Sequence, residues 1–340
     1  MHAELVVPAL LPRADAPPFP PTPALGLLLA RGRRTSNRRG SYELWIAAAC
    51  GLVEEARLPA GALTLLAEGG EPGEAVWMRA DPVHLRLGRT DLSFVPAAAF
   101  DLDALEGEAL AAALNRHYAG EFEFRAVAPH HWCARLACAP RLDALSTTEV
   151  AGRDVDANLP QGEDATLWHA RLNVIQMLLH AQPVNQAREA RGAPEVNSLW
   201  FWGAGSIPAA RAHCTDFRWR SVSADEPVAR GLALRCGARA LRLPANAAAW
   251  LEQLPEEGRH LAVLDALRVP LALGDAAAWN ARLAELEAQW FAPLVVALRK
   301  GRIGMLTLHA CDGREALACE TVRGDLRRFW RRARPLAAYL

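Results

Sequence analysis

Short, predominantly apolar runs constrain the fold of this chain most. The clearest lie at residues 5–11, 198–202, 261–265 and 303–308. Runs of this length without polar alternation are typical of strands covered on both faces of a sheet. Longer segments with helical character are predicted at 42–52, 166–181 and 276–299. Buried strands that alternate with helices favour an α/β protein whose sheet is largely parallel.

The length of the chain indicates more than one domain. With 340 residues and 51% hydrophobic content, the chain exceeds the usual size of a single domain. Between about residues 58 and 126, short strand-like pieces alternate with turns around one helix at 105–118, which is typical of an α+β domain. We therefore predict a core built from residues 1–57 and 190–340, interrupted by an inserted domain at 58–189.

Composition excludes some classes of protein. The 38 basic and 38 acidic residues balance, which argues against a general polyelectrolyte role. No signal peptide is evident and no apolar segment approaches the roughly 20 residues of a membrane span, so we expect a cytoplasmic protein without a membrane partner. The seven cysteines fit no structural zinc pattern, and no cofactor is expected.

Arginine is concentrated in two short segments. The first contains Arg31, Arg33, Arg34, Arg38 and Arg39 and is expected to be an exposed loop. The second contains Arg323, Arg327, Arg328, Arg331, Arg332 and Arg334 around Phe329-Trp330. Such clusters are usually solvated surfaces, but local fields also bind nucleic acid or other anions in chains of zero net charge. Both interpretations stay open at this level.

One block of correctly spaced motifs resembles a known family. It comprises Leu172-Asn173, Leu178-Leu179, Pro183-Val184-Asn185, Arg188, Gly192, Asn197 to Gly205 and Pro208. The block is similar to the archaeal-type cofactor-independent phosphoglycerate mutases of the alkaline phosphatase superfamily, and more closely to the bacterial RpfE-type regulatory proteins. The resemblance implies an alkaline-phosphatase-like α/β core with an inserted α+β domain.

Weaker matches keep the family's order along the chain. Thr22-Pro23 with Gly32 resembles an early element, Val76 to Arg79 resembles a strand of the inserted domain, and Arg230-Gly231 resembles the returning core. Because the order is kept, the inference about fold is stronger than any one motif would permit.

The family's metal ligands are largely missing. Members follow the first strand with Asp-Gly-x-x-Asp, where this chain has Pro8-Ala9. Their late His-x-x-x-x-Asp-x-x-x-His element corresponds to Asp265, Pro270 and Gly274, and only His309 remains of the final Asp-His pair. Ser41 lies near the nucleophile position, but a serine without activating cations is a poor nucleophile. We therefore expect no metal site.

Three functions follow from this comparison. The first is a phosphoglycerate-mutase-like protein with a degenerate metal site, which binds a regulatory ligand or a protein partner. The second is an active metal-dependent phosphoglycerate mutase or phosphatase, and the third is an interaction module that contacts nucleic acid through its arginine clusters. For the first, the expected ligand is a phosphorylated or other anionic molecule, because arginine grips phosphate and carboxylate without metal. The expected ligand-binding residues are Arg79, Asn185, Arg188, Asn197, Gly203 and Gly205.

Overall fold

The chain forms two compact units. The computed structural model describes residues 1–11, 19–38, 42–50, 58–88, 92–207, 217–255, 257–311, 316–334 and 336–339. The core unit consists of Met1–Leu52 and Ala212–Leu340, and the inserted unit of Val53–Arg211. The first division lies near the predicted residue 58, whereas the second lies about twenty residues beyond the predicted residue 189.

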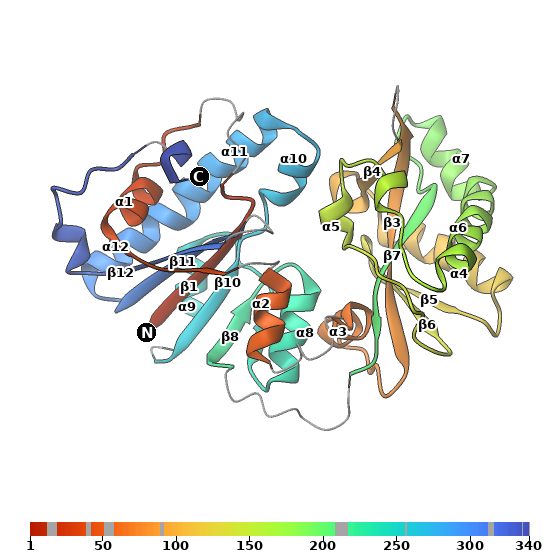
Figure 1. The fold of residues 1–340 in the computed structure, drawn as a ribbon, viewed down its shortest axis with the longest axis horizontal. Coiled ribbons are helices and arrows are strands. Elements are labelled where there is room, and N and C mark those ends of the chain that lie inside the picture. Colours follow the sequence, from red (N-terminus) through yellow and green to blue (C-terminus); the bar gives the residue numbers. More distant parts are fainter. Residues whose placement is uncertain are drawn as a thin grey trace. The chain divides into compact units, whose positions relative to one another are not determined.

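The core unit contains a seven-stranded sheet (Figure 1). In spatial order its strands are β2 (Arg33–Arg38), β12 (Ala316–Val322), β11 (Met305–Cys311), β1 (His2–Pro8), β10 (Arg259–Val263), β8 (Trp219–Ser223) and β9 (Arg239–Leu241). The five strands from β11 to β9 are parallel, and β12 and β2 continue the sheet antiparallel. The carboxyl ends of β1, β8 and β10 therefore meet at one edge, where open α/β sheets bind ligands.

Helices cover both faces of the core sheet. One face buries Leu5, Val7 and Leu308 in a large apolar cluster. The helices of this cluster are α1 (Pro23–Arg31), α9 (Ala247–Gln253), α11 (Ala276–Leu286) and α12 (Ala292–Lys300), the last two joined by a π-helical turn at Glu287–Phe291. The other face carries α2 (Tyr42–Ala49) and α8 (Pro227–Arg235). The short α10 (Arg268–Ala272) follows β10, and 3₁₀ turns lie at Asp325–Arg327 and Leu336–Tyr339.

The inserted unit is built on an antiparallel sheet. Its central strand is β3 (Val76–Leu87), which pairs with β4 (Leu92–Pro96) and β6 (His131–Leu136) on one side and with β7 (Ser198–Gly205) on the other. Strand β5 (Glu123–Ala128) pairs with β6. The twelve-residue strand β3 thus lies at the centre of the sheet and pairs with three other strands.

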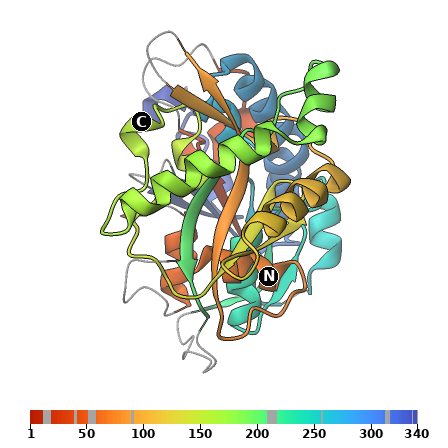
Figure 2. The ribbon, with the colours of Figure 1, turned by 90° about the vertical axis from the view of Figure 1, so that its right-hand side faces the viewer.

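Two layers of helices enclose this sheet. The helices α4 (Ala104–His117) and α6 (Ala165–His180) lie across one face, as the gold and yellow-green ribbons of Figure 2 show, and α7 (Pro183–Ala190) follows α6. The short helices α3 (Ala60–Ala67) and α5 (Thr147–Val150) contact the opposite face, and 3₁₀ turns lie at Ala97–Ala99 and Asp156–Asn158. Both faces of β7 are therefore buried.

Two local predictions were wrong. The apolar run at 198–202 was expected to be a strand of the core, but it belongs to β7 of the inserted unit. A strand buried on both faces has the same apolar pattern in either sheet, so periodicity could not assign it. Residues 33–38 were expected to be a loop and form the edge strand β2.

The predicted fold class is confirmed: an α/β core is interrupted by an α+β domain. In the described part of the chain, no helix combines the length and apolar composition needed to cross a membrane.

Candidate functional site

The carboxyl end of β1 keeps an unusual backbone conformation. Ala9 has a φ of 60° and is the one non-glycine residue with positive φ in the described ranges. This left-handed region favours glycine and costs other residues roughly 1 kcal/mol. The resemblance places Ala9 where the family has the glycine of its Asp-Gly pair, and Pro8 where it has the aspartate. Pro8 has no ligating side chain, and the left-handed residue Ala9 lies directly after it.

An ionic cluster occupies the neighbouring part of this edge. Arg268, the first residue of α10, places its Nη1 2.7 Å from Oε1 of Glu43 and 3.3 Å from the hydroxyl of Tyr42. Its guanidinium carbon lies 5.1 Å from the centre of the Tyr42 ring. The other carboxylate oxygen of Glu43, Oε2, is buried and accepts no hydrogen bond within the described structure. The arginine charge therefore offsets the burial of this carboxylate.

Burial and charge shift the titration of these groups. Burial raises the pKa of Asp265 to about 6; Arg268 opposes this rise and the charge of Asp225 adds to it. Burial, and next the charge of Glu43, raise the pKa of Tyr42 well above its usual value. For Arg268, burial would lower the pKa, but Glu43, Tyr42 and Asp265 raise it overall. At neutral pH the cluster therefore holds a permanent guanidinium cation among carboxylates.

His309 contributes to a different group of residues. It lies within β11, and its Nε2 is 3.4 Å from Oε2 of Glu4 on β1, while its ring lies 4.6 Å from that of Trp45. Arg259 donates through Nε to Oε1 of the same glutamate at 2.6 Å. Burial would raise the pKa of Glu4, but the hydrogen bond to His309 and the charges of Arg259 and His2 lower it to about 2. His309 therefore stabilises a buried carboxylate on the sheet face.

These positions do not fit the two divalent cations of the family. Pro8, Pro270 and Gly274 carry no ligating side chain, and His309 is engaged by Glu4. Asp265 remains, but the guanidinium of Arg268 lies close enough to shift its pKa. In the ranges that the structure describes, no group of three or more His, Cys, Asp or Glu residues is arranged to hold a metal ion.

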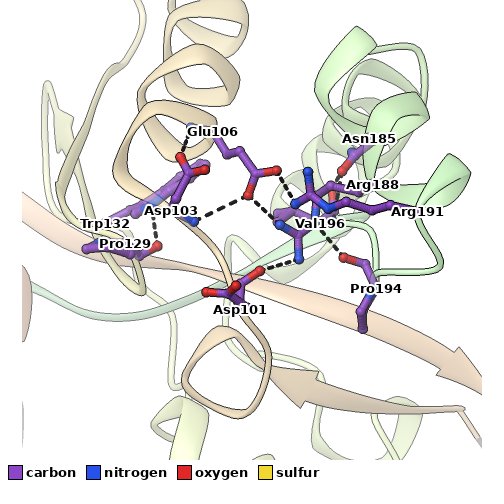
Figure 3. Close-up of polar contacts among 10 residues, drawn as sticks. All are labelled: Asp101, Asp103, Glu106, Pro129, Trp132, Asn185, Arg188, Arg191, Pro194 and Val196. Atoms are coloured by element: carbon purple, nitrogen blue, oxygen red, sulfur yellow. Dashed lines mark hydrogen bonds and ion pairs between the residues drawn. The ribbon is translucent and has the colours of Figure 1, made fainter.

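Two predicted ligand residues, Asn185 and Arg188, lie together in the inserted unit (Figure 3). The Asn185 amide donates to the carbonyls of Leu179 and Val196, both at 2.8 Å, and accepts from the Val196 amide at 2.9 Å. These three bonds fasten the end of α6 to the segment that enters β7. Asn185 is 1% exposed.

Arg188 fastens α7 to the start of α4. Its side chain is 0% exposed, and it donates to the carbonyl of Pro194 at 2.7 Å, to the carbonyl of Asp101 at 2.6 Å and to Glu106. Glu106 also pairs with Arg191 and closes a capping box with Asp103 (Figure 3). Every nitrogen of the Arg188 guanidinium therefore has an internal acceptor.

Arg79 lies on the opposite face of the inserted sheet from Arg188. It donates to Asp81 at 2.8 Å and to the Thr64 hydroxyl at 2.9 Å, and its guanidinium carbon lies 5.2 Å from the centre of the Trp202 ring. Asp81 accepts in turn from Trp202 Nε1 at 2.7 Å. Arg79 and Arg188 therefore do not lie close enough together to bind the same anion.

Asn197 and the two glycines support the path of β7. The Asn197 amide bonds to both the N–H and the carbonyl of Leu85 on β3, at 2.6 and 3.0 Å. Gly203 has a φ of 63°, and a Cβ there would lie 2.4 Å from Cβ of Ala60. At Gly205 a Cβ would lie 3.0 Å from Cβ of Pro59. These glycines let α3 approach the strand closely. Ser41, the candidate nucleophile, lies outside the described residues.

Sequence reasoning missed Tyr42, Glu43 and Arg268. Of this cluster, only Asp265 had been singled out, through the family's late motif. Arg268 lies more than two hundred residues from Glu43 in the sequence, and neither residue belongs to a recognisable motif. Their association depends on where α10 and α2 begin in the fold.

Comparison with known proteins agrees with the motifs. The 2,3-bisphosphoglycerate-independent phosphoglycerate mutase of Methanothrix thermoacetophila is 27% identical over 113 residues, which is 33% of this chain and 27% of that protein. The corresponding enzyme of Methanosarcina acetivorans is 25% identical over 169 residues, 49% of this chain and 40% of that protein. The chain is similar to archaeal phosphoglycerate mutases. The matches span well under half the length of these curated relatives, and no family model matches the chain.

A solved structure shares the fold. The PH0037 protein of Pyrococcus horikoshii superposes with a TM-score of 0.57 at 13% identity, covering 99% of this chain and 92% of that chain. This likeness extends over both units. At this identity the likeness shows a shared fold.

Proposed function

We propose that this phosphoglycerate-mutase-like protein acts by binding a ligand or a partner, without metal-dependent phosphoryl transfer. The observation that carries the proposal is Arg268. Its guanidinium lies among Glu43, Tyr42 and Asp265, at the sheet edge where the family resemblance places metal ligands. An internal cation there balances the carboxylates, whereas it would repel a divalent ion.

In this proposal, the chain keeps the fold of the family but has lost its metal-dependent chemistry. The left-handed loop at Ala9 and the hydrogen-bonded return through Asn185 and Asn197 support retention of the family's architecture. Retention of fold with exchange of ligands is typical of proteins that have changed function. A regulatory role in the cytoplasm, as the resemblance to the bacterial RpfE-type proteins implies, belongs to this proposal.

The proposal is tested by metal binding and by turnover. Purified protein should show no change in melting temperature on addition of Mn²⁺, because a tight metal would stabilise the fold by several kcal/mol. It should also fail to interconvert phosphoglycerates in the presence of Mn²⁺. Two tightly bound cations, or mutase turnover, would contradict the proposal.

The role of Arg268 has its own test. Arg268→Gln should lower the free energy of unfolding by about 3 kcal/mol, because it leaves Glu43 and Asp265 without their cation. The matched control is Arg282→Gln on α11, where the arginine is exposed and pairs with an exposed Glu285, and it should change stability by less than about 1 kcal/mol. The double variant Glu43→Gln/Arg268→Gln should lose less than the sum of the single variants. Strict additivity would show that the two side chains are not coupled.

A further inference from the structure

The two arginine-rich segments, distant in sequence, lie side by side in the core unit. Arg328 donates to the carbonyl of Arg31, 297 residues away, and Arg331 donates to the carbonyl of Gly32, both at 3.4 Å. Arg31 donates in return to the carbonyl of Leu326. Figure 1 shows the dark blue C-terminal segment passing α1 beside β12. The fold therefore joins two basic segments into one surface.

This arginine surface consists of exposed side chains with few carboxylates. Its exposed members are Arg33, Arg34, Arg323, Arg327, Arg331, Arg332 and Arg334. The carboxylates seen among them are Glu320, which pairs with Arg33 at 2.9 Å, and Asp325, which pairs with Arg328 at 2.8 Å. In a chain of zero formal net charge, such a surface is a local excess of positive charge that attracts polyanions.

Two exposed aromatic side chains lie between Arg328 and Arg331 in the sequence of the second segment. Phe329 is 77% exposed and Trp330 is 67% exposed. Their ring centres lie 5.3 Å apart at an angle of 81°, so they do not stack on one another. Large aromatic side chains this exposed are typical of binding surfaces.

We propose that the arginine surface binds single-stranded nucleic acid. Arginines that follow a phosphate backbone and aromatic rings that stack with bases are the two components of single-strand recognition. Residues 328–334 contain no helix or strand, whereas the major groove of a duplex is read by a helix or a β-ribbon. Residues 328–334 also do not form an amphipathic helix whose continuous apolar face would insert into a membrane surface.

The test measures binding of a labelled oligonucleotide of about 20 nucleotides by fluorescence anisotropy. The single strand should bind more tightly than its duplex. Affinity should fall as the salt concentration rises from about 50 to about 200 mM. The logarithm of the association constant should fall linearly with the logarithm of the salt concentration, with a slope of about −0.7 for each phosphate contact. Arg327→Glu/Arg332→Glu should weaken binding and make this slope less steep. The control Arg116→Glu/Arg153→Glu, which reverses two exposed charges in the inserted unit, should leave both unchanged.

A second variant separates stacking from simple apolar contact. Phe329→Leu/Trp330→Leu keeps two apolar side chains but removes the rings, and it should weaken single-strand binding ~10-fold or more. Both positions are exposed, so the melting temperature should stay unchanged and report a folded protein. The proposal is overturned if the single strand does not bind at low salt, or if the leucine variant binds it as well as the wild type. Tighter binding to vesicles of phosphatidylcholine and phosphatidylserine, retained in the leucine variant, would also overturn it and identify a membrane surface.

Discussion

At the scale of single residues, Pro8 and Ala9 show what a sequence can predict at a site and what it cannot. That position 8 offers no metal ligand can be predicted from the sequence, because proline has no ligating side-chain atom. The left-handed conformation of Ala9 cannot, since alanine is a poor indicator of positive φ. The ion pair between Arg268 and Glu43 could not be predicted either, because the two residues meet only after the chain has folded.

Glu4 should make the free energy of unfolding depend on pH in the acid range. Its pKa lies at about 2 in the folded protein, against an ordinary value of 4.5. Its ionised form therefore contributes stability that is present above pH 4.5 and is lost as the pH falls towards 2. The full contribution is about 3 kcal/mol, at about 1.4 kcal/mol for each unit of pKa.

Chemical denaturation across this range measures the effect. Glu4→Gln should flatten the dependence of unfolding free energy on pH between about 4.5 and 2. The control Glu285→Gln replaces an exposed glutamate and should leave the dependence as in the wild type. Parallel curves for wild type and Glu4→Gln would show that another group controls the acid limit.

At the scale of elements, the helices were the most predictable part of the chain. The segments expected at 105–118 and 166–181 are α4 and α6 to within one residue at each end. The segment at 276–299 is α11 and α12, with a π-helical turn that an unbroken apolar pattern does not reveal. Strand β2 was missed because its sequence of Arg, Thr, Ser and Asn has no apolar alternation, and its partner β12 lies almost three hundred residues away.

The attachment of α7 to α4 depends on Arg188. Arg188→Ala should lower the free energy of unfolding by about 3 kcal/mol, since it leaves the carbonyls of Asp101 and Pro194 without a donor and Glu106 without its buried partner. Arg191→Ala is the matched control, because Arg191 pairs with the same Glu106 but its side chain is 52% exposed. It should cost less than about 1 kcal/mol. Equal losses in the two variants, measured by urea denaturation, would contradict the structural role of Arg188.

At the scale of the whole molecule, the boundaries of the inserted unit can be tested with fragments. A fragment of residues 58–207 contains all five strands of the inserted sheet and the apolar cluster around Leu199 and Phe201. It should fold by itself and unfold cooperatively in urea. The fragment 58–189, which ends where the sequence suggested, lacks β7 and should not reach a cooperative fold, because one side of β3 is left without its partner strand. Cooperative folding of the shorter fragment would show that β7 is dispensable to the unit.

The strand order of the core sheet also bears on how the protein behaves at high concentration. The sheet ends on one side at β9, which has only three residues, and on the other at β2, where Arg33 and Arg34 are exposed. Unpaired edge strands are the sites at which sheets join between molecules and start to aggregate. A very short strand offers few hydrogen bonds, and like charges repel between copies of the same edge. The core sheet is thus protected against intermolecular strand pairing at both ends, by brevity at β9 and by charge at β2.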